Sequence, residues 1–307
     1  LEEFKKSKDP IVLFAFENAA LDLGNFLPKT SQKALQAKVK EEQFSGKSQE
    51  VLSILSSDGN TDRRFVFVGL GKKKECNGES LRKAAGSAYR ALQTRFKHAW
   101  LLAFDNPQTL AEGLFLSSHE FSKYKKADPE IKLKSIQFLI LRNSDKDKTE
   151  KLIKKAGLYG EAVCYVRDLV NEGPSEKSPE TLAHMAKKLA GEQVTVKIID
   201  KAEAEKLGMG AYLGVARGSD KSPFFVHMTY KPKSKVKKRI ALVGKGIAFD
   251  SGGLSLKPPQ SMETMKMDMA GAATVLAILK SASELKLRKN VIGIIGCVEN
   301  LIGEKSF

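Results

Sequence analysis

The chain has 307 residues, of which 42% are hydrophobic and 29% are charged. These fractions are typical of a packed globular protein and exclude a wholly disordered chain, and at about 150 residues per domain the length predicts two domains. The 52 Lys and Arg residues exceed the 36 Asp and Glu residues by 16 charges, an excess that suits contact with polyanions but determines no fold.

The first half of the chain alternates apolar runs with amphipathic patterns. Runs rich in β-branched and aromatic residues predict strands at 11–16, 65–69, 99–104 and 136–141. Apolar residues at helical spacing predict helices at 32–42, 81–96 and 110–123. Such alternation favours an α/β domain with a largely parallel sheet.

A long polar helix is expected over 147–171, where apolar residues recur at helical spacing, and the alternation then restarts. Ser178 and Pro179 are typical of a helix start, as N-cap and first helical residue. The second half predicts strands at 194–199, 224–230, 240–244 and 291–297, and helices at 202–207 and 269–285. We therefore expect an N-terminal α/β domain, a linker helix and a second α/β domain, over residues 1–145, 146–171 and 172–307.

The spacing of the cysteines and the lack of a recognisable targeting signal in this sequence indicate a reducing compartment. The three cysteines lie far apart in sequence, so they form neither a CxxC pair nor a disulfide framework. No apolar run approaches the roughly 18 residues of a membrane span, and the first residues contain no apolar signal core. We expect a cytoplasmic protein that does not associate with membranes.

One segment differs in character from the rest of the chain. It runs from Val243 through a glycine-rich stretch to Lys257, and it continues from Met262 into an expected helix opened by Asp268. Sites in open α/β sheets gather beyond the carboxyl ends of strands, which is where this segment falls. A phosphate-binding loop is disfavoured, because the GxGxxG pattern has Phe249 at its sixth position and the P-loop pattern also fails.

The carboxylates of Asp250 and Asp268 are suitable ligands for divalent ions. Lys245 and Lys257 are compatible with such a site, because a nearby dication favours the neutral amine. The alternative for Asp268 is a plain helix N-cap, and for the lysines a pair of surface residues. The residues alone indicate a metal or anion site and leave these alternatives open.

Two runs of this segment, GKGIAFDSGGLSLK at 244–257 and METMKMDMAGAA at 262–273, closely resemble the leucyl (cytosol) aminopeptidase family. Supporting similarity lies at 167–171, 210–219 and 112–116. The resemblance is specific over about 165–300 and weak over 1–110. It implies a two-metal exopeptidase that removes N-terminal residues, leucine-type ones above all, from peptides.

The resemblance also implies roles for individual residues. Lys245 and Asp268 bind one metal ion, Asp250 bridges both ions, and Lys257 polarises the scissile carbonyl. Met265 lines the pocket for the N-terminal side chain, and all five residues contribute to substrate binding. The implied cofactors are two Mn²⁺ or Zn²⁺ ions per subunit, with bicarbonate in the complete enzyme, and the implied assembly is a homohexamer.

The sequence departs from the family after Glu299 and Asn300. The family continues into Asn-Thr-Asp-Ala-Glu-Gly-Arg, which supplies further metal ligands and a bicarbonate-binding arginine, and this chain contains no such motif. Two divalent ions carry four positive charges, whereas Asp250 and Asp268 offer two negative ones. We expect a partial copy that binds metal weakly and is inactive. Its α/β catalytic domain is incomplete at the C-terminus, and the resemblance implies that this domain, when complete, is larger than the smaller N-terminal α/β domain.

Two other functions compete with this hypothesis. A nucleic-acid-binding role is suggested by the net charge and by the stretch Lys231–Arg239, which has six basic residues in nine positions. The same stretch is also typical of a solvated hairpin loop, and the chain has no recognisable nucleic-acid-reading module. The third hypothesis is a non-catalytic scaffold, to which the missing ligands point.

Overall fold

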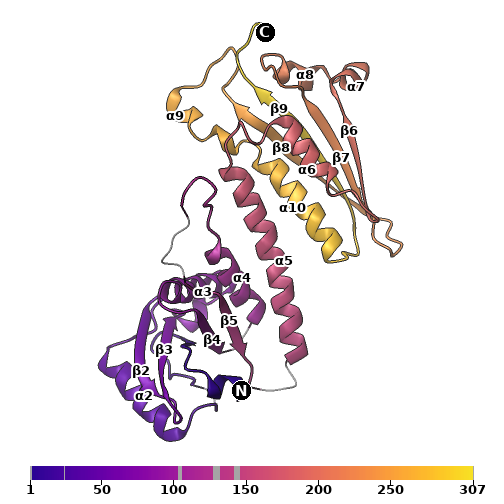
Figure 1. Cartoon of the computed structure of the whole chain (residues 1–307). Coiled ribbons are helices and arrows are strands. Elements are labelled where there is room, and N and C mark those ends of the chain that lie inside the picture. Colours follow the sequence, from indigo (N-terminus) through magenta and orange to yellow (C-terminus); the bar gives the residue numbers. More distant parts are fainter. Residues whose placement is uncertain (1, 24, 103–105, 127–131, 142–145, 307) are drawn as a thin grey trace. The chain divides into compact units, whose positions relative to one another are not determined.

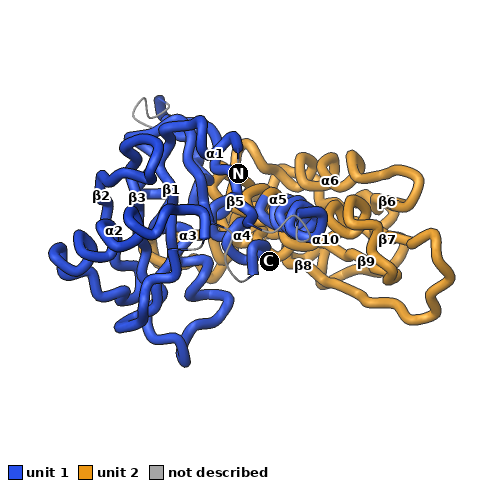
Figure 2. Tube along the Cα trace, turned by 90° about the horizontal axis from the view of Figure 1, so that it is seen from below, with its two compact units in different colours: residues 1–160 blue, residues 161–307 orange. Residues whose placement is uncertain are grey.

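The computed structural model describes all residues except 1, 24, 103–105, 127–131, 142–145 and 307. The chain divides into two compact units, residues 1–160 and residues 161–307 (Figure 2). The division falls inside the long helix α5, Lys146–Asn171. None of the helices in the described ranges combines the length and apolar character that crossing a bilayer requires.

Unit 1 is built on a five-stranded sheet in the order β2-β3-β1-β4-β5 (Figure 1). All its strand pairs are parallel except β2 with β3. The strands are β1 (Ile11–Ala15), β2 (Val51–Ser57), β3 (Asp62–Gly69), β4 (His98–Leu102) and β5 (Ser135–Leu139). The largely parallel sheet expected for the first half of the chain is therefore confirmed.

Helices cover both faces of this sheet. Besides the first part of α5, the helical elements of this unit are α1 (Glu2–Lys6), α2 (Lys29–Glu41), the 3-10 turn η1 (Lys73–Glu75), α3 (Gly78–Leu92) and α4 (Pro107–Ser118). Leu81 and Leu110, from α3 and α4, pack on one face with Val12, while Leu35 of α2 packs on the other face with Leu13. Because side chains alternate along a strand, β1 supplies both cores, which explains why it is buried throughout.

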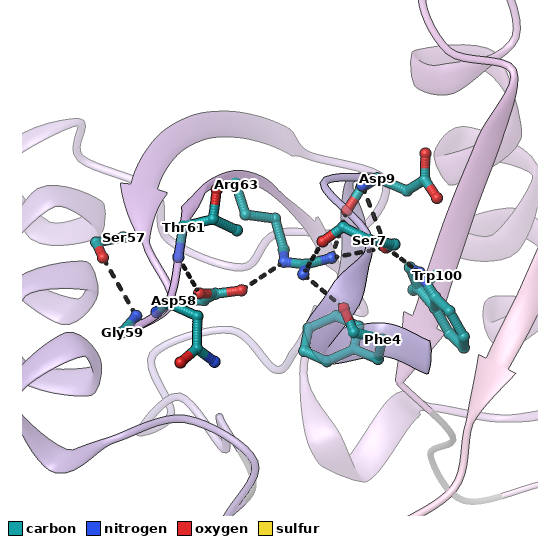
Figure 3. Close-up of polar contacts among 10 residues, drawn as sticks. Phe4, Ser7, Asp9, Ser57, Asp58, Gly59, Thr61, Arg63 and Trp100 are labelled. Carbon is teal, nitrogen blue, oxygen red and sulfur yellow. Dashed lines mark hydrogen bonds and ion pairs between the residues drawn. The ribbon is translucent and has the colours of Figure 1, made fainter. Parts of the chain in front are cut away.

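A fully buried arginine fastens the N-terminal residues to unit 1 (Figure 3). Arg63 on β3 forms an ion pair with the buried Asp58, with 2.9 Å between Nε and Oδ2. Its other nitrogens donate to the backbone carbonyls of Phe4, Ser7 and Asp9 at 2.6 to 2.8 Å. Every donor group of this charge therefore has an acceptor, as burial requires.

Unit 2 contains a four-stranded sheet in the order β6-β7-β9-β8, with α6 and α10 over one face (Figure 1). Its strands are β6 (Val194–Ile199), β7 (Phe224–Tyr230), β8 (Arg239–Asp250) and β9 (Asn290–Asn300). Its helices are α6 (Pro179–Lys187), α7 (Lys201–Lys206), α8 (Gly210–Ala216), α9 (Pro259–Met262), the 3-10 turn η3 (Met265–Met267) and α10 (Ala270–Glu284).

Most predicted elements of both halves are present, with bounds shifted by a few residues. Ser178 caps α6 as predicted, accepting a hydrogen bond from the backbone of Thr181. The strand β2 and the short helical elements α1, η1, α8, α9 and η3 were not predicted. Residues 103 and 104 of the strand expected at 99–104 lie outside the described residues.

The basic stretch 231–239 is not the hairpin loop that its flanking strands suggested. It joins β7 to β8, and β9 lies between these two strands in the sheet. The stretch therefore crosses the beginning of β9, where the side-chain amide of Asn290 donates to the carbonyl of Val236. Only β8 and β9 pair in parallel in this unit, so a largely parallel sheet is confirmed for unit 1 alone.

Candidate active site

Two of the predicted ligands lie on one strand. The strand expected at 240–244 extends over the whole of β8, so Lys245 lies within it and Asp250 is its last residue. Asp250 therefore ends a strand, and the glycine-rich turn begins only after it. β8 runs parallel to β9, and Asp250 comes opposite Asn300 after an irregularity in the pairing. The carboxyl ends of the two strands therefore form one edge.

Close packing of two glycines brings the start of α10 to this strand. A Cβ atom on Gly244 would lie 2.5 Å from the carbonyl oxygen of Gly271, so a side chain at that position would clash with α10. As a result Asp268, which precedes α10, reaches Lys245, with 2.8 Å between Nζ and Oδ1. Asp268 is not the N-cap of α10: Met269 occupies that position and the helix has no side-chain cap.

The second carboxylate oxygen of Asp268 has no hydrogen-bond partner although it is buried. An unsatisfied buried oxygen on an acidic side chain costs free energy unless a donor or a cation reaches it. Lys245 is the only described lysine paired with this carboxylate, and its side chain is 58% exposed. The oxygen thus lacks the donor or cation that would offset its burial.

Asp250 has donors on both of its carboxylate oxygens. Oδ1 accepts from the backbone amide of Gly252 at 2.9 Å and from the side-chain amide of Asn300 at 2.6 Å. Oδ2 accepts from Nζ of Lys257 at 2.5 Å. Burial by itself would raise the pKa of Asp250, but the hydrogen bonds from Lys257, Gly252 and Asn300 outweigh it, so the pKa lies below its usual value.

The turn that follows β8 places Lys257 on Asp250. Gly252 has φ of +94°, and a Cβ atom there would lie 2.4 Å from the carbonyl oxygen of Ser255. Only glycine adopts this conformation without strain. The backbone amide of Lys257 donates to the carbonyl of Ser251 at 2.9 Å, which closes the turn and directs the lysine back to the strand end.

Glu299 lies beside the site and anchors a neighbouring loop. It is 2% exposed, and it accepts hydrogen bonds from Ser219 at 2.7 Å and from Nζ of Lys221 at 2.8 Å. Backbone also approaches closely here, because a Cβ atom on Gly218 would lie 1.9 Å from the carbonyl oxygen of Leu301. These contacts hold the loop before β7 against the end of β9.

Two lysines donate hydrogen bonds to backbone carbonyls at the end of α5, and one of them belongs to the segment between Lys257 and Asp268. Lys266 donates to the carbonyl of Asn171 at 3.2 Å. The fully buried Lys177 donates to the carbonyls of Leu169 and Val170 at 2.8 and 3.1 Å. Burial, reinforced by the charge of Lys266, lowers the pKa of Lys177 to about 8.

The four predicted polar residues thus form two pairs, Lys245 with Asp268 and Lys257 with Asp250. Met265 opens η3 and is half-buried, and nothing in the structure assigns it a partner in the site. Sequence reasoning missed Asn300 and Glu299 as site residues. Their position at the end of a strand parallel to β8 was the signal that could have found them.

The side chains fit a divalent cation only in part. Asp268 provides an oxygen without a partner, and Lys245 and Asp250 provide a nitrogen and two more oxygens close to the same strand. Within the described ranges, however, no group of three or more His, Cys, Asp and Glu side chains is arranged to hold a metal ion. Two carboxylates cannot neutralise two dications, so the donor set present is too small for two ions.

Comparisons with known proteins agree with the sequence motifs. The model for the cytosol aminopeptidase family, N-terminal domain, matches residues 12–128, and that for its catalytic domain matches residues 164–307. The probable cytosol aminopeptidase of Aquifex aeolicus is 35% identical over 98% of this chain and 62% of its own length. That of a Sulfurihydrogenibium species is 38% identical over 83% of this chain and 52% of its own length.

A solved structure is also similar. The bottromycin maturation enzyme BotP, in complex with Mn, superposes with a TM-score of 0.79 and 26% sequence identity, over 98% of this chain and 61% of that protein. The chain therefore spans less than two thirds of the length of each of these three proteins.

Proposed function

The chain belongs to the cytosol aminopeptidase family, and from this premise we propose that its site serves the removal of N-terminal residues from peptides by a two-metal mechanism. The observation that supports it most directly is the buried, unpartnered Oδ2 of Asp268 beside the Lys245 amine. A protein carboxylate is seldom left in this state unless a cation or donor completes it.

The residues that would hold the ions are Lys245, Asp250 and Asp268. When bound, a pair of divalent ions supplies an activated water and a charge that stabilises the tetrahedral intermediate. Without the ions, Lys245 and Lys257 neutralise the two carboxylates, one lysine to each. We propose Mn²⁺ or Zn²⁺ as the ions, with the remaining ligands, and a bicarbonate site, supplied by residues outside this chain.

Lys257 is the residue that we assign to the carbonyl of the scissile bond. Its side chain is 27% exposed, so it reaches solvent while its Nζ contacts Asp250. An ammonium group at this position stabilises negative charge that develops on the carbonyl oxygen, where it is worth more than in bulk water. The closed turn at Gly252 limits the backbone positions from which the flexible side chain of Lys257 can extend.

Exopeptidase specificity follows from a demand for the free α-amine of the substrate. In its neutral form that amine would bind an ion held by Lys245, Asp250 and Asp268, as a ligand that only an N-terminus offers. Met265 is the residue that we place beside the N-terminal side chain. An unbranched, polarizable methionine accommodates bulky apolar groups, which supports a leucine-type preference. We further propose a cytoplasmic location and assembly into a homohexamer for the whole protein.

The test compares two forms of the protein. One is the 307-residue chain, and the other, the extended chain, adds the part of the A. aeolicus relative that lies outside the match. With Mn²⁺ and a leucyl-peptide, we expect the extended chain to release leucine and the 307-residue chain to release none. Asp250→Asn should abolish release in the extended chain although the variant still folds, as a cooperative urea transition would show.

Two results would count against the proposal. Retained leucine release by the Asp250→Asn variant would remove this site from the reaction. Release of leucine by the unextended chain would show that its two carboxylates suffice, which contradicts the charge balance on which the proposal of inactivity depends.

A further inference from the structure

Asn300 connects the ends of the two parallel strands that form the edge of the site. It is the last residue of β9, opposite Asp250 at the end of β8. Its carbonyl accepts from the backbone amide of Ser251 at 2.8 Å and from the Ser251 hydroxyl at 3.0 Å. Its side-chain amide donates to Oδ1 of Asp250 at 2.6 Å. The backbone carbonyl and the side-chain amide of Asn300 therefore form hydrogen bonds with two successive residues, Ser251 and Asp250.

The two oxygens of Asp250 are used differently. Oδ1 has two donors, the Gly252 amide and the Asn300 side chain, and both come from the folded framework. Among the described residues, Oδ2 has only the ammonium group of Lys257 as a partner, and this group is the end of a flexible side chain. An incoming cation can replace a flexible ammonium group more readily than a donor fixed in the framework, so Oδ2 is the oxygen available to a ligand.

We propose that Asn300 is a positioning residue that holds the Asp250 carboxylate with Oδ2 directed at the cation site. This inference rests on the proposed function, since the cation is the proposed metal. A single donor from Gly252 fixes one point of the carboxylate, whose terminal torsion is otherwise broad. The second donor fixes its plane. Residues that orient a ligand in this way typically change metal affinity 10- to 100-fold when removed.

The side chain of Asn300 is itself held in place. Gly253 has φ of +70°, and a Cβ atom there would lie 3.1 Å from Oδ1 of Asn300, so the turn packs closely on the amide. Glu299, one residue earlier, bonds the separate loop of Ser219 and Lys221. Ser219 thus offers a matched control: its hydroxyl bonds a carboxylate at the same strand end without contacting Asp250.

The first experiment is a double-mutant cycle in the 307-residue chain, measured by urea unfolding without metal. Asn300→Ala should lower the folding equilibrium constant about tenfold, because it removes a hydrogen bond to a charged group. The same change in an Asp250→Ala background should have an effect of less than about threefold if the two residues act on each other. Equal effects in both backgrounds would overturn the positioning role.

The second experiment measures Mn²⁺ affinity by electron paramagnetic resonance of the free ion, in the extended chain. We expect Asn300→Ala to weaken binding about tenfold or more and Ser219→Ala to leave it unchanged, although both variants lose one hydrogen bond to a carboxylate. Equal affinity of wild type and Asn300→Ala would overturn the inference alone. Absence of saturable Mn²⁺ binding by wild type would instead overturn the proposed function. The double-mutant cycle would then still show whether Asn300 and Asp250 interact.

Discussion

The buried Lys177 allows a sharp test of how unit 2 holds the end of α5. Its ammonium group is fully buried and has two backbone carbonyls, Leu169 and Val170, as partners. The charged groups that act on it are Lys266, which lowers its pKa, and Glu172, which raises it. Burial is the larger influence, and the pKa falls from 10.5 to about 8.

The sign of the stability effect follows from the lowered pKa. Below pH 8 Lys177 is protonated in both the folded and the unfolded protein, and the folded protein bears the full free-energy cost of the buried charge. Between pH 8 and 10.5 the folded state releases a proton that the unfolded state retains, so the free energy of unfolding rises with pH. At about 1.36 kcal/mol per pH unit, the rise across this window is about 3 kcal/mol.

The assay compares wild type with Lys177→Met in urea at pH values from 7 to 10. We expect the stability of wild type relative to the variant to increase steadily above pH 8. Lys206→Met, at an exposed lysine of α7, serves as the control and should show no such trend. A difference between wild type and Lys177→Met that is independent of pH would refute the reasoning that Lys177 is buried as an ammonium group.

Further predictions concern the two units separately. Arg63→Met should destabilise unit 1 by about 3 kcal/mol or more, since it leaves the charge of the buried Asp58 without its ion-pair partner; a loss below about 1 kcal/mol in urea unfolding would contradict this. Gly252→Ala should cost about 2 kcal/mol through its backbone conformation, whereas Gly191→Ala, with open space around it, should cost far less. In the extended chain, Lys257→Met should lower kcat by about 100-fold with little change in KM, and a change confined to KM would assign Lys257 to binding alone.

Sequence periodicity located most helices and strands because local signals determine them. Ser178 and Pro179 mark the start of α6, and a capping residue acts within one turn of its own position. β2 escaped detection because only two of its seven residues are buried, which leaves little apolar pattern to read. The direction of strand pairing in unit 2 was also beyond local signals, because it depends on which strands become neighbours.

The candidate site also depends partly on local sequence and partly on tertiary structure. The sequence by itself determined the composition of the segment 243–273, and its resemblance to a family of aminopeptidases identified Lys245, Asp250, Lys257 and Asp268. Only the tertiary structure decided that Lys245 pairs with Asp268, that Lys257 pairs with Asp250, and that Asn300 completes the second pair. Asp250 and Asn300 are 50 residues apart, and they meet because β8 and β9 are adjacent and parallel and end at the same edge. Contacts of this kind depend on strand order and on the close packing of α10 against β8, which no short stretch of sequence specifies.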